Sequence, residues 1–109
     1  MKKILAEISL GELADKITIL EIKMEKIINK ESLNTIKKEY QSLKSINIEI
    51  INLEKYKQLF NDLKLINEKL WDIENEKRLL EKNSDFGDKF IQVSRDVHFM
   101  NDKRAKIKK

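Results

Sequence analysis

The sequence predicts an all-α protein, an antiparallel helical bundle of about four helices with one long central helix. Apolar residues recur every three or four positions almost from end to end, as on the buried face of a helix. Charged residues make up 39% and hydrophobic residues 40%, and there are no prolines and two glycines, so the composition suits packed amphipathic helices better than disorder. A length of 109 residues indicates a single helical domain over 1–109.

The first helix has a clear start. After an extended lead-in over 1–8, Ser9-Leu-Gly-Glu12 forms a capping box, in which the serine hydroxyl and the glutamate carboxylate satisfy free helical amides. Ile19 and Ile22 lie off the main apolar seam, so we expect neighbouring helices on two sides. The helix should end near 29–30, and its heptad seam consists of Leu10, Leu13, Ile17, Leu20, Met24 and Ile27.

The second helix is less sharply bounded. Ser32 or Asn34 can open it, and its apolar stripe consists of Leu33, Ile36, Tyr40, Leu43 and Ile46. Residues 46–53 alternate partly with period two and are rich in β-branched side chains, as in a strand. A lone strand has no evident partner in this chain, so we interpret this stretch as a fraying helix end and a connection.

The third helix, over about 54–82, is the longest and most regular. At about 1.5 Å per residue it extends on the order of 40 Å. Lys77 is the only break in its seam, which consists of Tyr56, Leu59, Leu63, Ile66, Leu70, Ile73 and Leu80.

The fourth helix follows a break at Asn83-Ser84 and is capped by Asp85-Phe-Gly-Asp88. We expect it to fray over the basic end of the chain, residues 103–109. Its seam consists of Phe86, Phe90, Val93, Val97, Met100 and Ile107.

Short connections favour antiparallel neighbours, arranged as an up-down bundle or a pair of long hairpins. A helix of nearly thirty residues projects beyond shorter partners and exposes its seam. A second copy of the chain would cover that surface, so we predict a homodimer built on coiled-coil contacts.

The two glycines, Gly11 and Gly87, each lie two residues after a helix cap. Such a position can bind phosphate at the free amides. An acidic residue follows each glycine and would repel an anion, so the sequence favours close packing of another helix against the bare backbone.

Composition excludes several classes of protein. The chain has no cysteine, so it forms neither disulfides nor thiolate metal sites. His98 is the only histidine and has no companion ligand, which leaves no metal site to predict. Glu7 interrupts the first apolar run, and no segment approaches the roughly 18 uncharged apolar residues of a membrane span. We therefore expect a cytoplasmic protein without membrane contact.

The net charge of +4 raises the question of nucleic-acid binding. Its basic residues are 20 lysines and three arginines, a bias typical of AT-rich coding sequence. Arg95, Lys103, Arg104 and Lys106 on the fourth helix could contact phosphates, but the basic tail over 103–109 has no interleaved aromatic residues to stack on bases. A solvated helix end that complements the helix dipole is favoured.

One polar set lies beside the seam of the third helix. Asn67, Trp71, Glu74 and Arg78 are four, three and four residues apart and therefore share one face. The set could hold a small polar or anionic ligand, with Arg78 as the fixed charge. The simpler interpretation is an interhelical salt-bridge and hydrogen-bond network with Trp71 in the core. In that network the Glu74–Arg78 ion pair contributes only about 0.2–0.5 kcal/mol when exposed.

Lys16 and Lys23 on the first helix could also approach an anion inside the bundle, as in helical enzymes resembling chorismate mutase. Such sites need several converging arginines and lysines, and this helix contains no arginine. Solvated lysines are therefore favoured.

Three blocks of the sequence resemble a family of short, uncharacterised bacterial and bacteriophage proteins that form a domain of unknown function. The first block is SLGELADKITILEIK over 9–23, the second is NEKLWDIE over 67–74, and the third begins with FGDKFI over 86–91 and continues through Arg95, Val97, Asn101-Asp102, Arg104 and Ala105. Members often carry proline where this chain has Leu10. The resemblance implies an all-helical fold and supplies no activity.

No catalytic constellation and no cofactor motif stand out in the sequence. We therefore expect a non-enzymatic helical module for self-association or protein interaction. Weak nucleic-acid binding through the basic fourth helix is one alternative. A small anionic-ligand site around Trp71 and Arg78 is the other.

Overall fold

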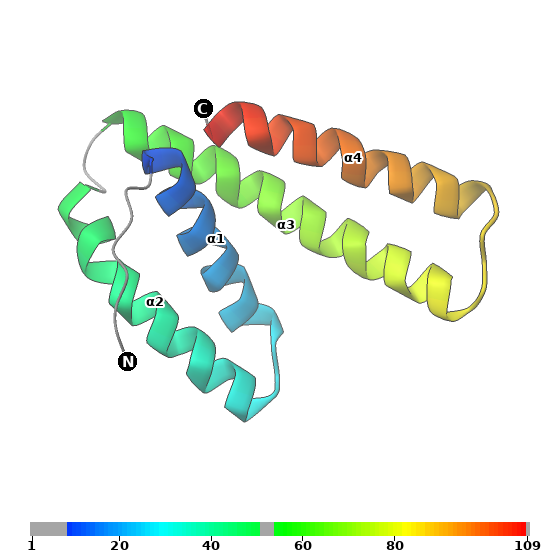
Figure 1. Cartoon of the computed structure of the whole chain (residues 1–109), viewed down its shortest axis with the longest axis horizontal. Coiled ribbons are helices and arrows are strands. Elements are labelled where there is room, and N and C mark those ends of the chain that lie inside the picture. The colour runs from blue at the N-terminus through cyan, green and yellow to red at the C-terminus, as the bar shows by residue number, and fades with distance from the viewer. Residues whose placement is uncertain (1–8, 51–53, 109) are drawn as a thin grey trace.

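The computed structural model describes residues 9–50 and 54–108, which form four helices: α1 (Leu10–Lys26), α2 (Lys30–Ile50), α3 (Glu54–Lys82) and α4 (Asp88–Lys108). These residues contain no strand. Figure 1 shows two antiparallel hairpins, α1–α2 and α3–α4, with α1 lying against the N-terminal half of the long α3. The all-α prediction with one long central helix is confirmed.

The serine half of the predicted capping box is confirmed, because the Ser9 hydroxyl accepts a hydrogen bond from the Glu12 amide at 3.1 Å. The Glu12 carboxylate forms an ion pair with Lys108 of α4. The predicted junction with α2 is wrong by a few residues. α1 ends at Lys26, and the Asn29 side chain caps α2 by accepting from the Ser32 amide at 3.1 Å. Asn29 thus opens the second helix, and Ser32 lies within its first turn.

The remaining helix boundaries lie at or near their predicted positions where the structure describes them. Residues 46–50 are helical, whereas 51–53, 1–8 and Lys109 lie outside the described residues. α3 has the predicted bounds. The turn that follows it is possible because Ser84 adopts a positive φ of 55°. α4 extends over the basic end as far as Lys108, and the Arg104 and Lys108 side chains contact α1.

The core lies where α1, α3 and the end of α4 meet. Ala14, Tyr56 and Leu63 are fully buried there, and Ile107 packs against them. Ile22 is 1% exposed although it lies off the main seam of α1. α1 contacts all three other helices, which confirms that it has neighbours on more than one side.

A second set of contacts ties the two hairpins together. Glu21 of α1 accepts a hydrogen bond from Lys64 of α3 at 2.5 Å and lies 3.5 Å from the Tyr40 hydroxyl of α2. Burial, and then the nearby Glu21 charge, raises the pKa of Tyr56 to about 12. The buried Tyr56 phenol is therefore neutral at physiological pH.

The outer half of α3 and much of α4 extend beyond the α1–α2 hairpin as a two-helix arm (Figure 1). The molecule accordingly measures 47 × 33 × 25 Å. Large apolar side chains are exposed along this arm, including Leu79, Phe86, Ile91 and Phe99. Only one helix covers each arm helix, which explains why so many apolar groups remain in contact with water.

Candidate functional site

A buried polar cluster joins α1, α3 and α4. Asp15, Thr18 and Asn67 are each at most 5% exposed. The Asn67 side-chain amide donates to Asp15 Oδ1 and to Thr18 Oγ1, both at 2.9 Å. The Thr18 hydroxyl in turn donates to the Asp15 backbone carbonyl oxygen at 2.9 Å. Buried polar groups are tolerated only when they are hydrogen-bonded in this way.

Arg104 of α4 completes this cluster. Its Nε lies 2.8 Å from Asp15 Oδ1 and its terminal nitrogen lies 2.5 Å from Asp15 Oδ2, which makes a two-pronged ion pair. The third guanidinium nitrogen reaches Asn101 at 3.4 Å. The planar fork of arginine matches a carboxylate in this geometry, whereas lysine could make only a point contact.

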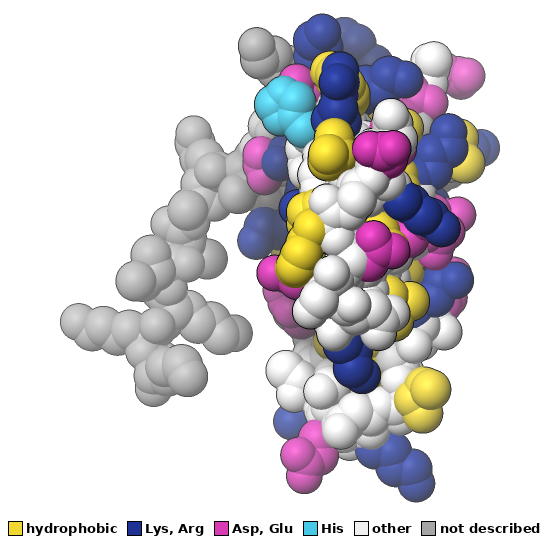
Figure 2. Space-filling model, turned by 90° about the vertical axis from the view of Figure 1, so that its right-hand side faces the viewer, with side chains coloured by type: hydrophobic (Ala, Val, Ile, Leu, Met, Phe, Trp, Pro, Cys, Tyr) yellow, Lys and Arg dark blue, Asp and Glu magenta, His cyan; other side chains and the backbone are white. Residues whose placement is uncertain are grey.

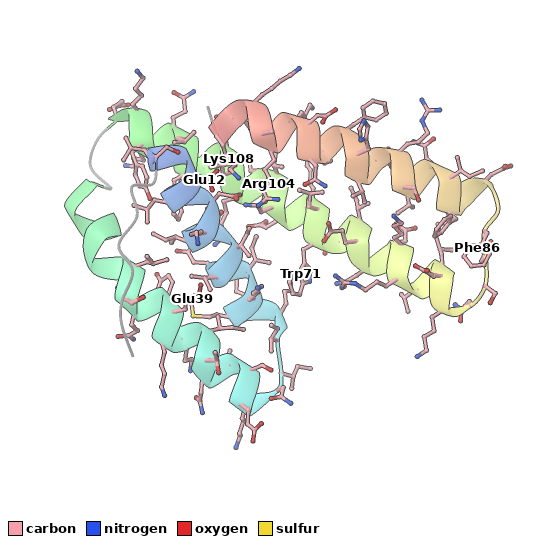
Figure 3. All side chains as sticks on the ribbon, viewed as in Figure 1. Glu12, Glu39, Trp71, Phe86, Arg104 and Lys108 are labelled. Atoms are coloured by element: carbon pink, nitrogen blue, oxygen red, sulfur yellow. The ribbon has the colours of Figure 1, made fainter. Side chains whose placement is uncertain are left out.

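The end of α4 crosses the beginning of α1 at very short range. Lys108 Nζ lies 3.1 Å from Glu12 Oε1 and 3.3 Å from Asp15 Oδ2, and Figure 3 shows Glu12, Arg104 and Lys108 gathered at this crossing. A Cβ atom on Gly11 would overlap with the Lys108 carbonyl oxygen. The predicted close packing is therefore confirmed at Gly11. At Gly87 it is wrong, because no other helix of the described chain packs against this glycine and its near neighbour is Asp85 Oδ1, at 3.5 Å from a Cβ built there.

The cluster shifts the ionisation of both partners. Burial raises the pKa of Asp15, but the hydrogen bonds from Arg104 and Asn67 and the charges of Arg104 and Lys108 outweigh it, so the net pKa lies below the ordinary value of 3.8. The hydrogen bond to Asp15 raises the pKa of Arg104 despite its partial burial. Both groups are charged at neutral pH.

A cleft of about 200 Å³ opens beside this cluster, between α1, α3 and α4. Five residues of the predicted ligand set line it, namely Lys23, Asn67, Trp71, Glu74 and Arg78. Lys16 does not line the cleft and its side chain is exposed. Figure 3 shows Trp71 in the space between α3 and the C-terminal part of α1.

The polar side chains of the cleft are only partly engaged. Arg78 donates to the Asn75 side chain at 2.8 Å, and the expected ion pair with Glu74 is not formed. Among the described residues, the Lys23 ammonium makes no ion pair and the Trp71 indole N–H makes no hydrogen bond. The ligand role of this set remains a prediction.

A separate apolar face lies on α4, on the outside of the arm. Ile91 is 54% exposed and Phe99 is 52% exposed, and Phe90 lines the same shallow hollow. Arg95 lies 5.9 Å from the centre of the Phe99 ring, and His98 lies 3.6 Å from Asp102. Figure 2 shows hydrophobic side chains at the surface beside the single histidine.

The residues predicted to contact nucleic acid do not form one surface. Lys103 and Lys106 are exposed and line a hollow with Lys69 of α3, whereas Arg95 lies on the apolar face of α4. Arg104 turns inward onto Asp15, with 28% of its side chain exposed. The geometry therefore does not favour the expected phosphate contact at Arg104.

Sequence reasoning missed the central role of Asp15. The signal was present, because Gly11, Asp15, Thr18 and Ile22 form a second stripe on α1 with heptad spacing, and all of them are buried. Arg104 likewise occupies a seam position of α4, four residues after Met100. An acidic residue on one helix stripe and a basic residue on another could have predicted that Asp15 and Arg104 form an ion pair.

Within residues 9–50 and 54–108, no helix has the length and apolarity to cross a membrane. The same residues contain no group of three or more histidine, cysteine, aspartate or glutamate side chains placed to hold a metal ion.

The fold and the cluster define a small all-helical protein, in which two hairpins are joined by a buried ion pair between the first and last helices. The chain belongs to a family of unknown function (DUF6165), which it matches over residues 3–109. No curated protein and no solved structure matches the chain.

Proposed function

We propose that this protein is a cytoplasmic, non-enzymatic helical interaction module that forms a homodimer through the outer face of α4. The observation that carries the proposal is the pair of exposed apolar side chains Ile91 and Phe99, which flank Arg95 on a face that no other described helix covers. Contiguous apolar surface of this kind is uncommon on a monomer and is typical of interaction sites.

A second copy of the chain is the partner that the charges favour. In an antiparallel pair of α4 helices whose two-fold axis passes beside His98 and Phe99, Arg95 lies opposite Asp102 of the partner subunit. The two Phe99 rings then meet at the axis, and each Arg95 finds an opposite charge. Such self-complementarity is what a two-fold interface requires.

The size of this face sets the expected strength of the dimer. One helix per subunit buries less surface than a standard stable interface. We therefore expect a dissociation constant on the order of micromolar, with reversible exchange between monomer and dimer.

Sedimentation velocity across a micromolar concentration series tests the proposal. Phe99→Glu should abolish the dimer, because it places a charge on each side of the two-fold axis. Leu65→Glu is the matched control, since Leu65 is 60% exposed but lies on α3 away from this face, and it should leave the dimer intact. A wild-type monomer at high micromolar concentration would refute the proposal.

Charge exchange tests the register of the two helices. Arg95→Asp and Asp102→Arg should each weaken the dimer, because each places like charges opposite one another. The double variant should restore it. If the double variant is as weak as the single ones, the antiparallel register is wrong.

Non-specific nucleic-acid binding is a second candidate, and one observation favours it. Lys69, Lys103 and Lys106 come together from α3 and α4 around one hollow, in which Asp62 is the one acidic residue among the described lining residues, so the hollow carries a net positive charge. Binding to random-sequence DNA should then appear at low salt, fall steeply as salt increases and disappear in the Lys103→Glu/Lys106→Glu variant. Absence of binding at low salt would remove this candidate.

A further inference from the structure

From the geometry of the cleft between α1, α3 and α4, we infer that it binds a small aromatic carboxylate, with the ring against Trp71 and the carboxylate near Lys23 and Arg78. This site is independent of the α4 face proposed for dimerisation. The two surfaces share no lining residue.

The walls of the cleft specify the body of the ligand. Ile19, Ile22 and Leu70 supply an aliphatic lining, and Trp71 adds an aromatic one. A planar ring can pack against an indole with little loss of conformational entropy, which favours an aromatic ligand over a flexible chain.

The volume limits the size of the ligand. A cleft of about 200 Å³ is smaller than the roughly 300–1,000 Å³ of pockets for drug-sized ligands. It corresponds to about seven waters at roughly 30 Å³ each. A single ring with one small substituent fits this space.

The charges specify the ionic group. Arg104 is already paired with Asp15, so this pair adds little net charge to the cleft. Lys23 and Arg78 have no carboxylate partner among the described residues, and Glu74 is the opposing acid. The cleft therefore has two cations and one anion without an ion-pair partner, and this net positive charge favours a ligand with a single negative charge.

Hydrogen-bond donors are also available for that group. Arg78 donates to the Asn75 amide oxygen and keeps its other guanidinium N–H groups for a ligand. The guanidinium fork fits a carboxylate in particular. The Trp71 indole N–H, which has no partner among the described residues, is a further donor at the same wall.

Trp71 is the only tryptophan in the chain, so its fluorescence reports directly on the cleft. Benzoate should change the emission saturably, with half-saturation on the order of 1 mM for a ligand of this size. Acetate lacks the ring and benzylammonium carries the opposite charge, so neither should produce a saturable change. A response to benzylammonium equal to that of benzoate would overturn the charge argument.

Two substitutions should act in opposite directions. Arg78→Gln should weaken benzoate binding about tenfold, as expected for loss of a hydrogen bond to a charged group. Glu74→Gln removes the opposing charge and should strengthen binding severalfold. Lys82→Gln, an equal loss of charge at an exposed position off the cleft, should have no effect.

Circular dichroism and thermal melting establish that each variant is folded before titration. The proposal is refuted if benzoate gives no saturable signal on the folded wild type. It is also refuted if Arg78→Gln and Glu74→Gln shift the affinity in the same direction, because a general change in packing would do that.

Discussion

Replacing Asp15 by asparagine should destabilise the fold through the loss of a single charge. The side chain keeps its shape, but it now presents one oxygen where Asp15 offered two to Arg104 and Lys108. An amide donor then faces the cationic donors that previously met Oδ2. One hydrogen bond to a charged group is lost, which contributes about 1.5–3 kcal/mol, and the weaker Lys108 contact adds up to about 0.5 kcal/mol.

Partial exposure of the cations reduces this loss. The Arg104 side chain is 28% exposed and that of Lys108 is 22% exposed, so water can reach some of the freed donors. We therefore expect a decrease of about 1–3 kcal/mol in the free energy of unfolding, below the roughly 3–5 kcal/mol typical of fully buried pairs. With a urea m-value of about 1.5–2 kcal/mol/M, the midpoint should fall by about 0.5–2 M.

The same substitution should alter the pH dependence of stability. Because the folded-state pKa of Asp15 lies below its ordinary value of 3.8, its contribution is fully present above that value and is lost as pH falls through the lowered pKa. The wild type should therefore lose more stability than Asp15→Asn between about pH 5 and pH 2. At neutral pH neither protein should show a pH dependence from this group.

Urea unfolding followed by circular dichroism at several pH values measures both effects. Asp72→Asn is the matched control, since Asp72 is exposed on α3 and makes no ion pair among the described residues. It should change stability by less than about 0.5 kcal/mol. Equal midpoints for Asp15→Asn and wild type, with equal m-values, would refute the view that this ion pair holds α4 onto α1.

Three further substitutions test the packing, each measured by urea unfolding. Gly11→Ala should cost about 1–3 kcal/mol despite the better helix propensity of alanine, because its Cβ would overlap with the Lys108 carbonyl oxygen. Gly87→Ala should cost less than Gly11→Ala, because a Cβ at Gly87 makes an ordinary contact with Asp85 at 3.5 Å. Ser9→Ala should cost about 1 kcal/mol by removing the cap of α1, and no change would mean that the cap is redundant. Leu63→Ala should cost about 3–5 kcal/mol, a large share of a typical domain's stability, and a loss below 1 kcal/mol would contradict its full burial.

Local sequence signals determined the helices. The capping box at Ser9, the unbroken seam of 54–82 and the break at Asn83-Ser84 each depend on residues within a few positions of one another. Errors arose where two local signals competed. Asn29 could end one helix or cap the next, and only the hydrogen bond to the Ser32 amide shows which it does.

The candidate cleft was predictable in part for the same reason. Asn67, Trp71, Glu74 and Arg78 share a face of one helix, so helical periodicity alone places them together. Lys23 and Arg104 reach the same cleft from other helices, and their positions depend on how those helices pack. The expected Glu74–Arg78 ion pair does not form, because residues four apart on a helix can make contact but need not. Arg78 donates instead to the Asn75 side-chain oxygen.

The positions of the helices and their buried faces were predictable, because both follow from interactions within about two turns of chain. The ion pair of Asp15 with Arg104 and the close approach of Gly11 to Lys108 join residues separated by almost the whole chain, so both depend on how the helices pack. The positions of the helices alone are compatible with many different contacts between distant residues. The burial of one carboxylate selects among them, because in the core it requires a cation with matching geometry.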